Sequence, residues 1–319
     1  MHGAQIMTAS SASSIPESGF ARILIGVDSS PMSARVAKYV CGLVRPGMEV
    51  RIVSVAENPR ALVPLGSLAD AVFETIREEL LGDASEAVKQ AQEVFADANI
   101  DVDARVLELS RLGGYAGNAL IDAAGEWHAD LLVVGARQHH GILRWFEGTV
   151  SEFVTSQTPC SILIVPASYV ATIHAYPRRI LFALDGSETS FNALRSGLHL
   201  ARPDSSTRAV YVVDRAVRFL EKTFIEEGDK ALAAAAEVFA NQINAGELGL
   251  VNTDPASDDI PHTIVREAQR WHADLIVVGT HGRRGFSRWF LGSVAGRTAR
   301  ITQTPLLMVR PHPNTSSLS

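Results

Sequence analysis

The chain has 319 residues, of which 46% are hydrophobic and 20% are charged, a composition typical of globular proteins with room for more than one core. A formal net charge of −6 and the lack of a dominant basic stretch argue against a nucleic-acid-binding surface. Two cysteines are too few for a disulfide framework, and no apolar run reaches the roughly 18 residues of a membrane span. We therefore expect a cytoplasmic protein that binds neither nucleic acid nor membrane.

The first half of the chain, taken in order, predicts alternating strands and helices. Residues 1–19 are rich in Ser and Ala without an apolar segment, which is typical of a disordered tail. The intervening periodic segments predict helices at 32–44 and 71–99, the second either continuous or broken at Gly82, and at 115–127, with a last helix that begins at Thr149. Short apolar or alternating runs predict strands at 22–27, 49–55, 101–107, 130–134 and 161–165.

The second half repeats this alternation. Residues 168–176 are expected to form a linker, and residues 312–319 a loose tail. Helices are predicted at 188–201, 226–245, 262–271 and 294–301. Strands are predicted at 179–184, 207–213, 248–253, 274–278 and 306–309. Such alternation predicts an α/β fold, with a parallel sheet covered by helices on both faces.

Two stretches of the chain are copies of one another. The segment 127–150 matches 271–294 at a spacing of 271 − 127 = 144 residues, with 14 identical positions out of 24. The strand 23–28 matches 180–185 at a spacing of 157. The chain therefore predicts two tandem domains, residues 20–167 and 177–311, each long enough to bury its own core.

A glycine-rich stretch follows the fourth predicted strand of the second copy. Two residues separate Gly279 from Gly282, and nine more separate Gly282 from Gly292, after which a helix is predicted. Glycines let backbone N–H groups approach an anion, and the positive end of a helix dipole favours phosphate. Ser293 is expected to be the N-cap and Arg283 to supply counter-charge. Alternatively, the glycines serve only a turn between strand and helix.

This spacing is neither the P-loop pattern nor the dinucleotide fingerprint. It resembles the G-2x-G-9x-G-[S/T] motif of the ATP-binding universal stress proteins. The segment 184–187, Leu-Asp-Gly-Ser, is similar to the Val-Asp-Gly-Ser segment at the first strand end in that family. The resemblance covers both copies and implies two tandem doubly wound domains, each with a five-stranded, Rossmann-like parallel sheet. It also implies ATP as the ligand, with Mg²⁺ or Mn²⁺ held through the phosphates.

The resemblance further implies which residues contact the nucleotide. Asp185 and its neighbouring backbone are expected to contact adenosine, Val213 to wall the adenine, and the glycine motif to hold the ribose and phosphates. Asp185 alone is equally well explained as a carboxylate at the positive end of a helix. The nucleotide-binding residues implied in this way are Ala183, Asp185, Gly186, Val213, Gly279, His281, Gly282, Arg283, Gly292, Ser293 and Val294.

The first copy departs from this pattern. Gln138 stands where the second copy has Gly282, and Ser29-Ser30-Pro31 replaces Gly186-Ser187-Glu188. A glutamine obstructs a position that needs positive φ or close phosphate approach. The first copy is therefore expected to bind ATP weakly or not at all. The positions that it keeps are Asp28, Gly135, Gly148 and Thr149.

Other conspicuous residues have simpler interpretations. Adjacent residues such as His139 and His140 rarely converge on one ion, so a solvated loop is favoured over a metal site. The aromatic pairs at 145–146 and 289–290 are interpreted as loop anchors rather than base-stacking platforms. Cys41 and Cys160 are each flanked by apolar residues and are expected to be buried.

No catalytic motif is evident, so no catalytic residue is assigned and an enzymatic activity stays uncertain. We expect a nucleotide-responsive stress or regulatory module in which ATP orders loop 280–292 and biases contacts with an unidentified protein partner. A nucleotide-independent interaction module and a slow ATPase are the open alternatives. In the family that the chain resembles, the last strands of two domains pair. Strands 161–165 and 306–309 are therefore expected to form an internal pseudo-dimer, and a homodimer of the chain is a further expectation.

Overall fold

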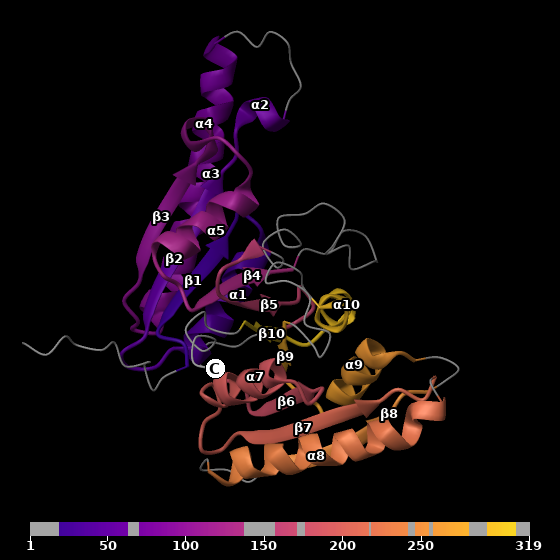
Figure 1. Ribbon diagram of the computed structural model, residues 1–319. Coiled ribbons are helices and arrows are strands. Elements are labelled where there is room, and N and C mark those ends of the chain that lie inside the picture. Colours follow the sequence, from indigo (N-terminus) through magenta and orange to yellow (C-terminus); the bar gives the residue numbers. More distant parts are fainter. Residues whose placement is uncertain are drawn as a thin grey trace, which may run out of the picture.

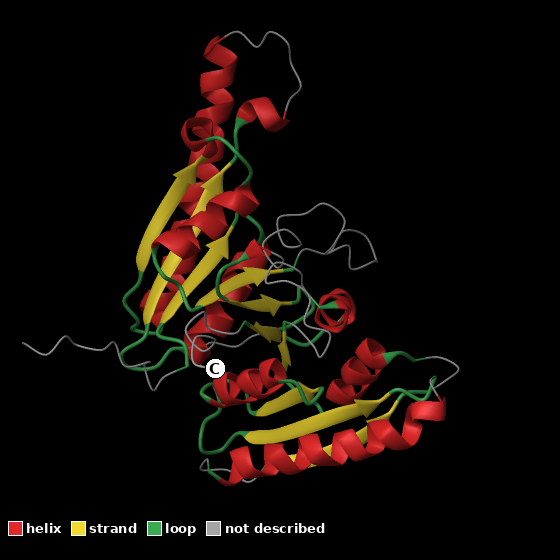
Figure 2. Cartoon of the chain, in the orientation of Figure 1, coloured by secondary structure: helices red, strands yellow, loops and turns green. Residues whose placement is uncertain are grey.

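The computed structural model describes residues 19–62, 70–136, 157–170, 176–216, 218–241, 246–254, 258–280 and 292–310 (Figures 1 and 2). No helix among them is long and apolar enough to cross a membrane. The tails expected at the two ends, apart from Gly19, lie outside these residues.

The strands of both copies join in one ten-stranded sheet of order β3-β2-β1-β4-β5-β10-β9-β6-β7-β8. Within each copy every pair is parallel, while β5 and β10 pair antiparallel across the two copies, with Leu307 opposite Leu163. This is the internal pairing that the sequence predicted, and both strands are wholly buried. The strands are Arg22–Val27 (β1), Glu49–Ala56 (β2), Asp103–Glu108 (β3), Leu131–Gly135 (β4), Ser161–Val165 (β5), Arg179–Leu184 (β6), Ser206–Val213 (β7), Glu247–Asn252 (β8), Leu275–Gly279 (β9) and Leu306–Val309 (β10).

Helices cover both faces of the sheet, and each face has its own hydrophobic core. One core packs beneath α1, α3, α7 and α8, and the other beneath α5, α9 and α10. This arrangement confirms the predicted doubly wound α/β architecture. The α-helices are Pro31–Leu43 (α1), Pro59–Leu62 (α2), Asp70–Asp97 (α3), Leu109–Leu112 (α4), Ala116–Glu126 (α5), Glu188–Leu198 (α7), Glu221–Ala240 (α8), Ile260–Arg270 (α9) and Ser293–Ile301 (α10), with a short 3-10 turn at Arg218–Leu220.

Several helix boundaries differ from the prediction. Helix α3 continues through Gly82, which is one of the two predicted alternatives, because a helical glycine costs only about 1 kcal/mol and Ala84 and Ala87 anchor the following turns in the core. Helix α8 begins at Glu221 rather than at 226, since Phe224 and Ile225 pack against the core. The short helices α2 and α4 were not predicted. Figure 1 shows α2 beside the end of α3 that extends beyond the sheet of the first copy.

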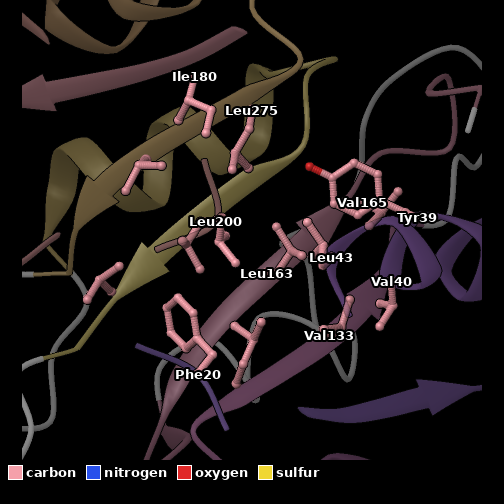
Figure 3. Close-up of a cluster of buried hydrophobic side chains, with 14 of the residues drawn as sticks. Phe20, Tyr39, Val40, Leu43, Val133, Leu163, Val165, Ile180, Leu200 and Leu275 are labelled. Atoms are coloured by element: carbon pink, nitrogen blue, oxygen red, sulfur yellow. The ribbon is translucent and has the colours of Figure 1, made fainter. Parts of the chain in front are cut away.

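The two copies share a continuous core where they meet (Figure 3). Tyr39 of α1 is 1% exposed and packs edge-on against Tyr169, which follows β5, with 5.4 Å between the ring centroids. Leu163 and Val165 of the first copy lie in the same cluster as Leu275 of the second. The buried side chains at this boundary therefore belong to both copies.

The repeated Trp-His-Ala-Asp segment lies at the amino ends of β4 and β9, at the opposite edge from the glycine motif. Asp130 accepts hydrogen bonds from the backbone of Ala21 and Arg22, and Asp274 does so from Arg178 and Arg179, each at 2.9 Å. Each carboxylate thereby fixes the start of the neighbouring strand. The repetition of this Asp has a structural explanation that involves no ligand.

The histidines in these segments end helices. His128 and His272 have φ of 53° and 54°, the left-handed conformation that commonly terminates a helix, and both side chains are exposed. The indole of Trp127 lies 4.5 Å from the guanidinium of Arg51, and that of Trp271 lies 4.6 Å from that of Arg179. Each tryptophan thus makes a cation–π contact with an arginine, which belongs to β2 in the first copy and to β6 in the second.

Candidate nucleotide site

Asp185 and Gly279, two of the residues that the sequence singled out, lie at the carboxyl edge of the second copy. Ala183 of β6 pairs with Val278 of β9, so Asp185 and Gly279 follow neighbouring strands at the same edge. Strand order reverses between β6 and β9, because the connection from β6 leads to β7 and that from β9 leads to β10. Ligands of open α/β sheets bind in the crevice at such a point.

Asp185 shapes the start of α7. Its Oδ1 accepts hydrogen bonds from the backbone N of Ser187 at 2.9 Å and from the Ser187 hydroxyl at 2.6 Å. Gly186 between them has φ of +81°, which favours glycine. Ser187 is the N-cap of α7, and its hydroxyl also accepts a bond from the backbone N of Ser190. Asp185 is half-buried at this end of β6.

Gly279 lies directly against the first turn of α7. A Cβ at this position would come within 3.0 Å of the Thr189 carbonyl oxygen and 3.2 Å of the Ser190 nitrogen. These are backbone atoms and cannot rotate away. The close approach of helix and strand alone therefore explains this glycine, and it also brings Thr189, which sequence reasoning missed, to the crevice. Thr189 and Met32 occupy equivalent positions in the two copies. The difference between these two residues is a sequence signal that could have pointed to Thr189.

The two ends of loop 281–291 are held together at the same edge. The backbone N of Gly292 donates to the carbonyl oxygen of Thr280 at 2.8 Å, and the N of Thr280 donates to the oxygen of Val309 at 3.1 Å. Thr280 is fully buried. The predicted contacts His281, Gly282 and Arg283 lie outside the described residues.

Helix α10 begins immediately after this loop. Gly292 is the N-cap and Ser293 is the first helical residue, so the expectation that Ser293 caps the helix was wrong. Gly292 has φ of −58° and ψ of 143°, so it is not itself helical. Its N–H donates to the carbonyl of Thr280 and therefore needs no partner within the helix. Ser293 is exposed and Val294 half-buried, which leaves the amino end of the helix accessible to an anion.

Val213 ends β7, but its side chain is fully buried in the core. Its carbonyl accepts a hydrogen bond from the backbone N of Thr253 at 3.0 Å. In this position the Val213 side chain is not exposed to a ligand, whereas the resemblance implied that it would contact the adenine. A contact at this strand end would have to use the backbone.

The corresponding crevice of the first copy is built differently. Asp28 Oδ1 accepts bonds from the backbone N of Ser30 at 2.8 Å and from the Ser33 hydroxyl at 3.1 Å. Ser29 is not among the described residues with positive φ, in contrast to Gly186. A Cβ at Gly135 would lie 2.6 Å from Cγ of Met32, so the Met32 side chain covers the strand end here. Gln138, Gly148 and Thr149 lie outside the described residues.

The titratable groups of the described part of the chain do not indicate metal or thiol chemistry. Within these ranges no three His, Cys, Asp or Glu side chains are grouped so as to hold a metal ion. Burial raises the pKa of Cys41 to about 12 and that of Cys160 to about 11, so both thiols stay protonated near neutral pH. Both cysteines are buried and unpaired, which confirms the sequence interpretation.

Comparison with known proteins places the chain in a family. The model of the universal stress protein family matches residues 19–166 and 177–310, so the chain belongs to this family and contains two copies of its domain. A universal stress protein from Mycolicibacterium smegmatis is 27% identical over 91% of this chain and 97% of its own length.

Solved structures of the family resemble the chain as well. A universal stress protein from Archaeoglobus fulgidus matches 92% of this chain and 98% of its own, with a TM-score of 0.66 and 17% identity. A universal stress protein in complex with cAMP matches 42% of this chain and 98% of its own, with a TM-score of 0.34 and 24% identity.

Proposed function

We propose that the second copy binds ATP, with Mg²⁺ or Mn²⁺ held through the phosphates, and that the protein is a nucleotide-responsive stress module. The observation that carries this proposal is the hydrogen bond between Gly292 and Thr280. It fixes both ends of the glycine motif at the strand-order reversal, beside the accessible amino end of α10. A phosphate bound within the loop would therefore lie next to a helix dipole.

Two groups of residues would contact different parts of the ligand. The backbone of Ala183 and Gly186 and the carboxylate of Asp185 would contact adenosine. The N–H groups of Ser293 and Val294 would meet the phosphates, because they have no partner inside the helix. The remaining contacts in this proposal are Val213 through its backbone, Gly279, His281, Gly282, Arg283 and Gly292.

The proposed mechanism is ligand-dependent order rather than turnover. A ligand that binds only the folded loop stabilises that state by RT ln(1 + [L]/Kd), or about 2.7 kcal/mol at a hundredfold excess over Kd. The ordered loop would present one surface to a partner protein and the free loop another. The response then depends on ATP concentration without any chemical step.

Calorimetric titration with ATP and Mg²⁺, using protein shown to be free of nucleotide, tests the proposal. We expect one site per chain, lost in Gly282→Val and retained in the control Gln138→Val, which places the same residue at the equivalent position of the first copy. Titration with cAMP, the ligand of one solved family member, tests whether the triphosphate is needed. No heat and no thermal shift with ATP would favour a nucleotide-independent interaction module. ADP and phosphate accumulating above the Gly282→Val level would favour a slow ATPase.

A further inference from the structure

Helices α5 and α9 occupy equivalent places in the two copies but carry opposite charge. At the spacing of 144 that relates Trp127 to Trp271, Asp122 corresponds to Arg266, and Glu126 corresponds to Arg270. All four charged side chains are exposed. Two residues one helical turn apart share a face, so α5 presents an acidic ridge and α9 a basic one.

Within the described ranges no ion pair is formed by Asp122, Glu126 or Arg270, so none is neutralised by a partner there. Arg266 pairs with Asp258 and also bonds to the carbonyl oxygen of Asn252. The acidic ridge therefore keeps both of its charges, and the basic ridge keeps at least that of Arg270.

The basic ridge borders an open hollow of about 470 Å³ beside the edge strand β8. Its lining includes Arg208, Asn252, Arg266, Glu267, Arg270 and Trp271. Arg208 is held by Glu267 at 2.7 Å and by Glu247 at 3.5 Å. This pairing, together with that of Arg266 with Asp258, leaves the exposed guanidinium of Arg270 as the uncompensated charge at the rim.

Gly249 of β8 lies beside Arg208, one of the residues that line the hollow. A Cβ here would lie 3.0 Å from Nη2 of Arg208. In the register of the sheet, Arg208 pairs with Glu247 as Arg51 pairs with Asp103, so Gly249 corresponds to Arg105 in the first copy. The same place in the first copy therefore carries a long side chain.

We propose that the α9 ridge and its hollow receive the α5 ridge of a second copy of this chain. Both helices pack on the same face of the continuous sheet, since both contribute to the core that also lies beneath α10. A twofold axis that brings these faces together sets α5 against α9 of the partner and repeats the contact with the roles exchanged. The contact is closed, because each ridge meets its complement once.

The contact is electrostatically selective rather than strong. Exposed ion pairs each contribute about 0.2–1 kcal/mol, whereas like charges brought into register repel. The dimer is therefore expected to depend on protein concentration and to weaken as salt shortens the Debye length from about 10 Å at 0.1 M to about 3 Å at 1 M.

Sedimentation equilibrium of the full chain at low salt tests this arrangement. One variant, Arg266→Glu/Arg270→Glu, makes both ridges acidic, and a second, Asp122→Lys/Glu126→Lys, makes both basic. Each variant alone is expected to be monomeric, with a dimer Kd raised at least about tenfold. An equimolar mixture of the two is expected to form a heterodimer, because every contact in it again joins opposite charges. Restored association also shows that both variants are folded.

The matched control is Lys222→Glu/Lys230→Glu on α8, which makes the same charge change at exposed positions on the opposite face of the sheet. It is expected to leave the wild-type dimer intact. The proposal is overturned if the wild type stays monomeric at about 100 μM and low salt, a concentration at which a dimer of about 10 μM Kd would be mostly formed. It is equally overturned if the variants dimerise like the wild type, or if the mixture stays monomeric.

Discussion

Arg45 and Arg202 reach across the boundary between the two copies in opposite directions. Nη2 of Arg45 donates to the carbonyl oxygen of Ala201 at 2.7 Å, and Nη2 of Arg202 donates to that of Gly42 at 3.1 Å. The two arginines are related by the repeat spacing of 157. Each binds a carbonyl near the carboxyl end of the other copy's first helix, where a cation is favoured.

Removal of both arginines should weaken the contact between the copies. Hydrogen bonds from charged groups contribute about 1.5–3 kcal/mol each, so Arg45→Ala/Arg202→Ala is expected to lower the free energy of unfolding by about 3 kcal/mol. Urea denaturation followed by circular dichroism measures this. Arg195→Ala, which removes an exposed ion pair with Glu188, is the control and should change stability by less than about 1 kcal/mol. An equal loss of stability in the double variant and in Arg195→Ala would show that Arg45 and Arg202 do not hold the two copies together.

His199 gives this boundary a pH dependence. Burial and then the charge of Arg45 lower the pKa of His199 below its ordinary value, and the ring lies against Gly19, where a Cβ would be 2.6 Å from Cδ2. The unfolded chain therefore takes up the proton first. Stability should be full above the unfolded pKa of about 6.5 and should fall as pH drops toward the folded pKa.

The check is the free energy of unfolding between pH 7.5 and 5.5 for the wild type and for His199→Gln. The wild type should lose more stability over this range. Parallel curves for the two proteins would show that His199 does not contribute.

The two glycines that end β9 and β4 should respond unequally to the same substitution. In Gly279→Ala the new methyl meets the backbone of α7, and the strain is expected to cost about 1–3 kcal/mol. In Gly135→Ala it meets the flexible Met32 side chain, which can rotate. Thermal unfolding of the two variants measures the difference. A loss in Gly135→Ala as large as that in Gly279→Ala would contradict this explanation.

Thr189 and Met32 are predicted to set access to the two crevices. Thr189→Met places in the second copy the side chain that covers Gly135 in the first. If ATP binds there, its Kd should rise at least about tenfold, the equivalent of 1.4 kcal/mol. Thr189→Val keeps the size but removes the hydroxyl that bonds to Ser187 at 2.8 Å. Weaker binding in Thr189→Met but not in Thr189→Val would assign the effect to bulk rather than to the hydrogen bond.

The architecture was predictable because it depends on patterns that recur. The two copies of Trp-His-Ala-Asp and the apolar runs that follow them located β4 and β9, and further apolar or alternating runs located the other strands. The pairing of β5 with β10 was expected from the resemblance to a family in which the last strands of two domains pair, and the structure confirms it. Helix starts were less predictable, because Phe224 and Ile225 extend α8 through contacts with the core that local propensity does not contain.

The site was predictable only in part for a similar reason. Asp185, Gly186 and Gly279 meet at one edge as the motif implied. The burial of Val213 and the approach of Thr189 to Gly279 arise from how α7 and α8 pack on the sheet. A spacing pattern in one segment does not report contacts made by another.

The antiparallel pairing of β5 and β10 also sets how the two copies are oriented in the sheet. Strands of the two copies run in opposite senses, so the two crevices open at opposite edges of the sheet. In an assembly of two identical single-domain chains, every substitution is present at both edges. Fusion into one chain removes that restriction: Gly186 is kept at one edge while Ser29 and Met32 are accepted at the other. A substitution at one edge of the fused chain therefore leaves the other edge unchanged.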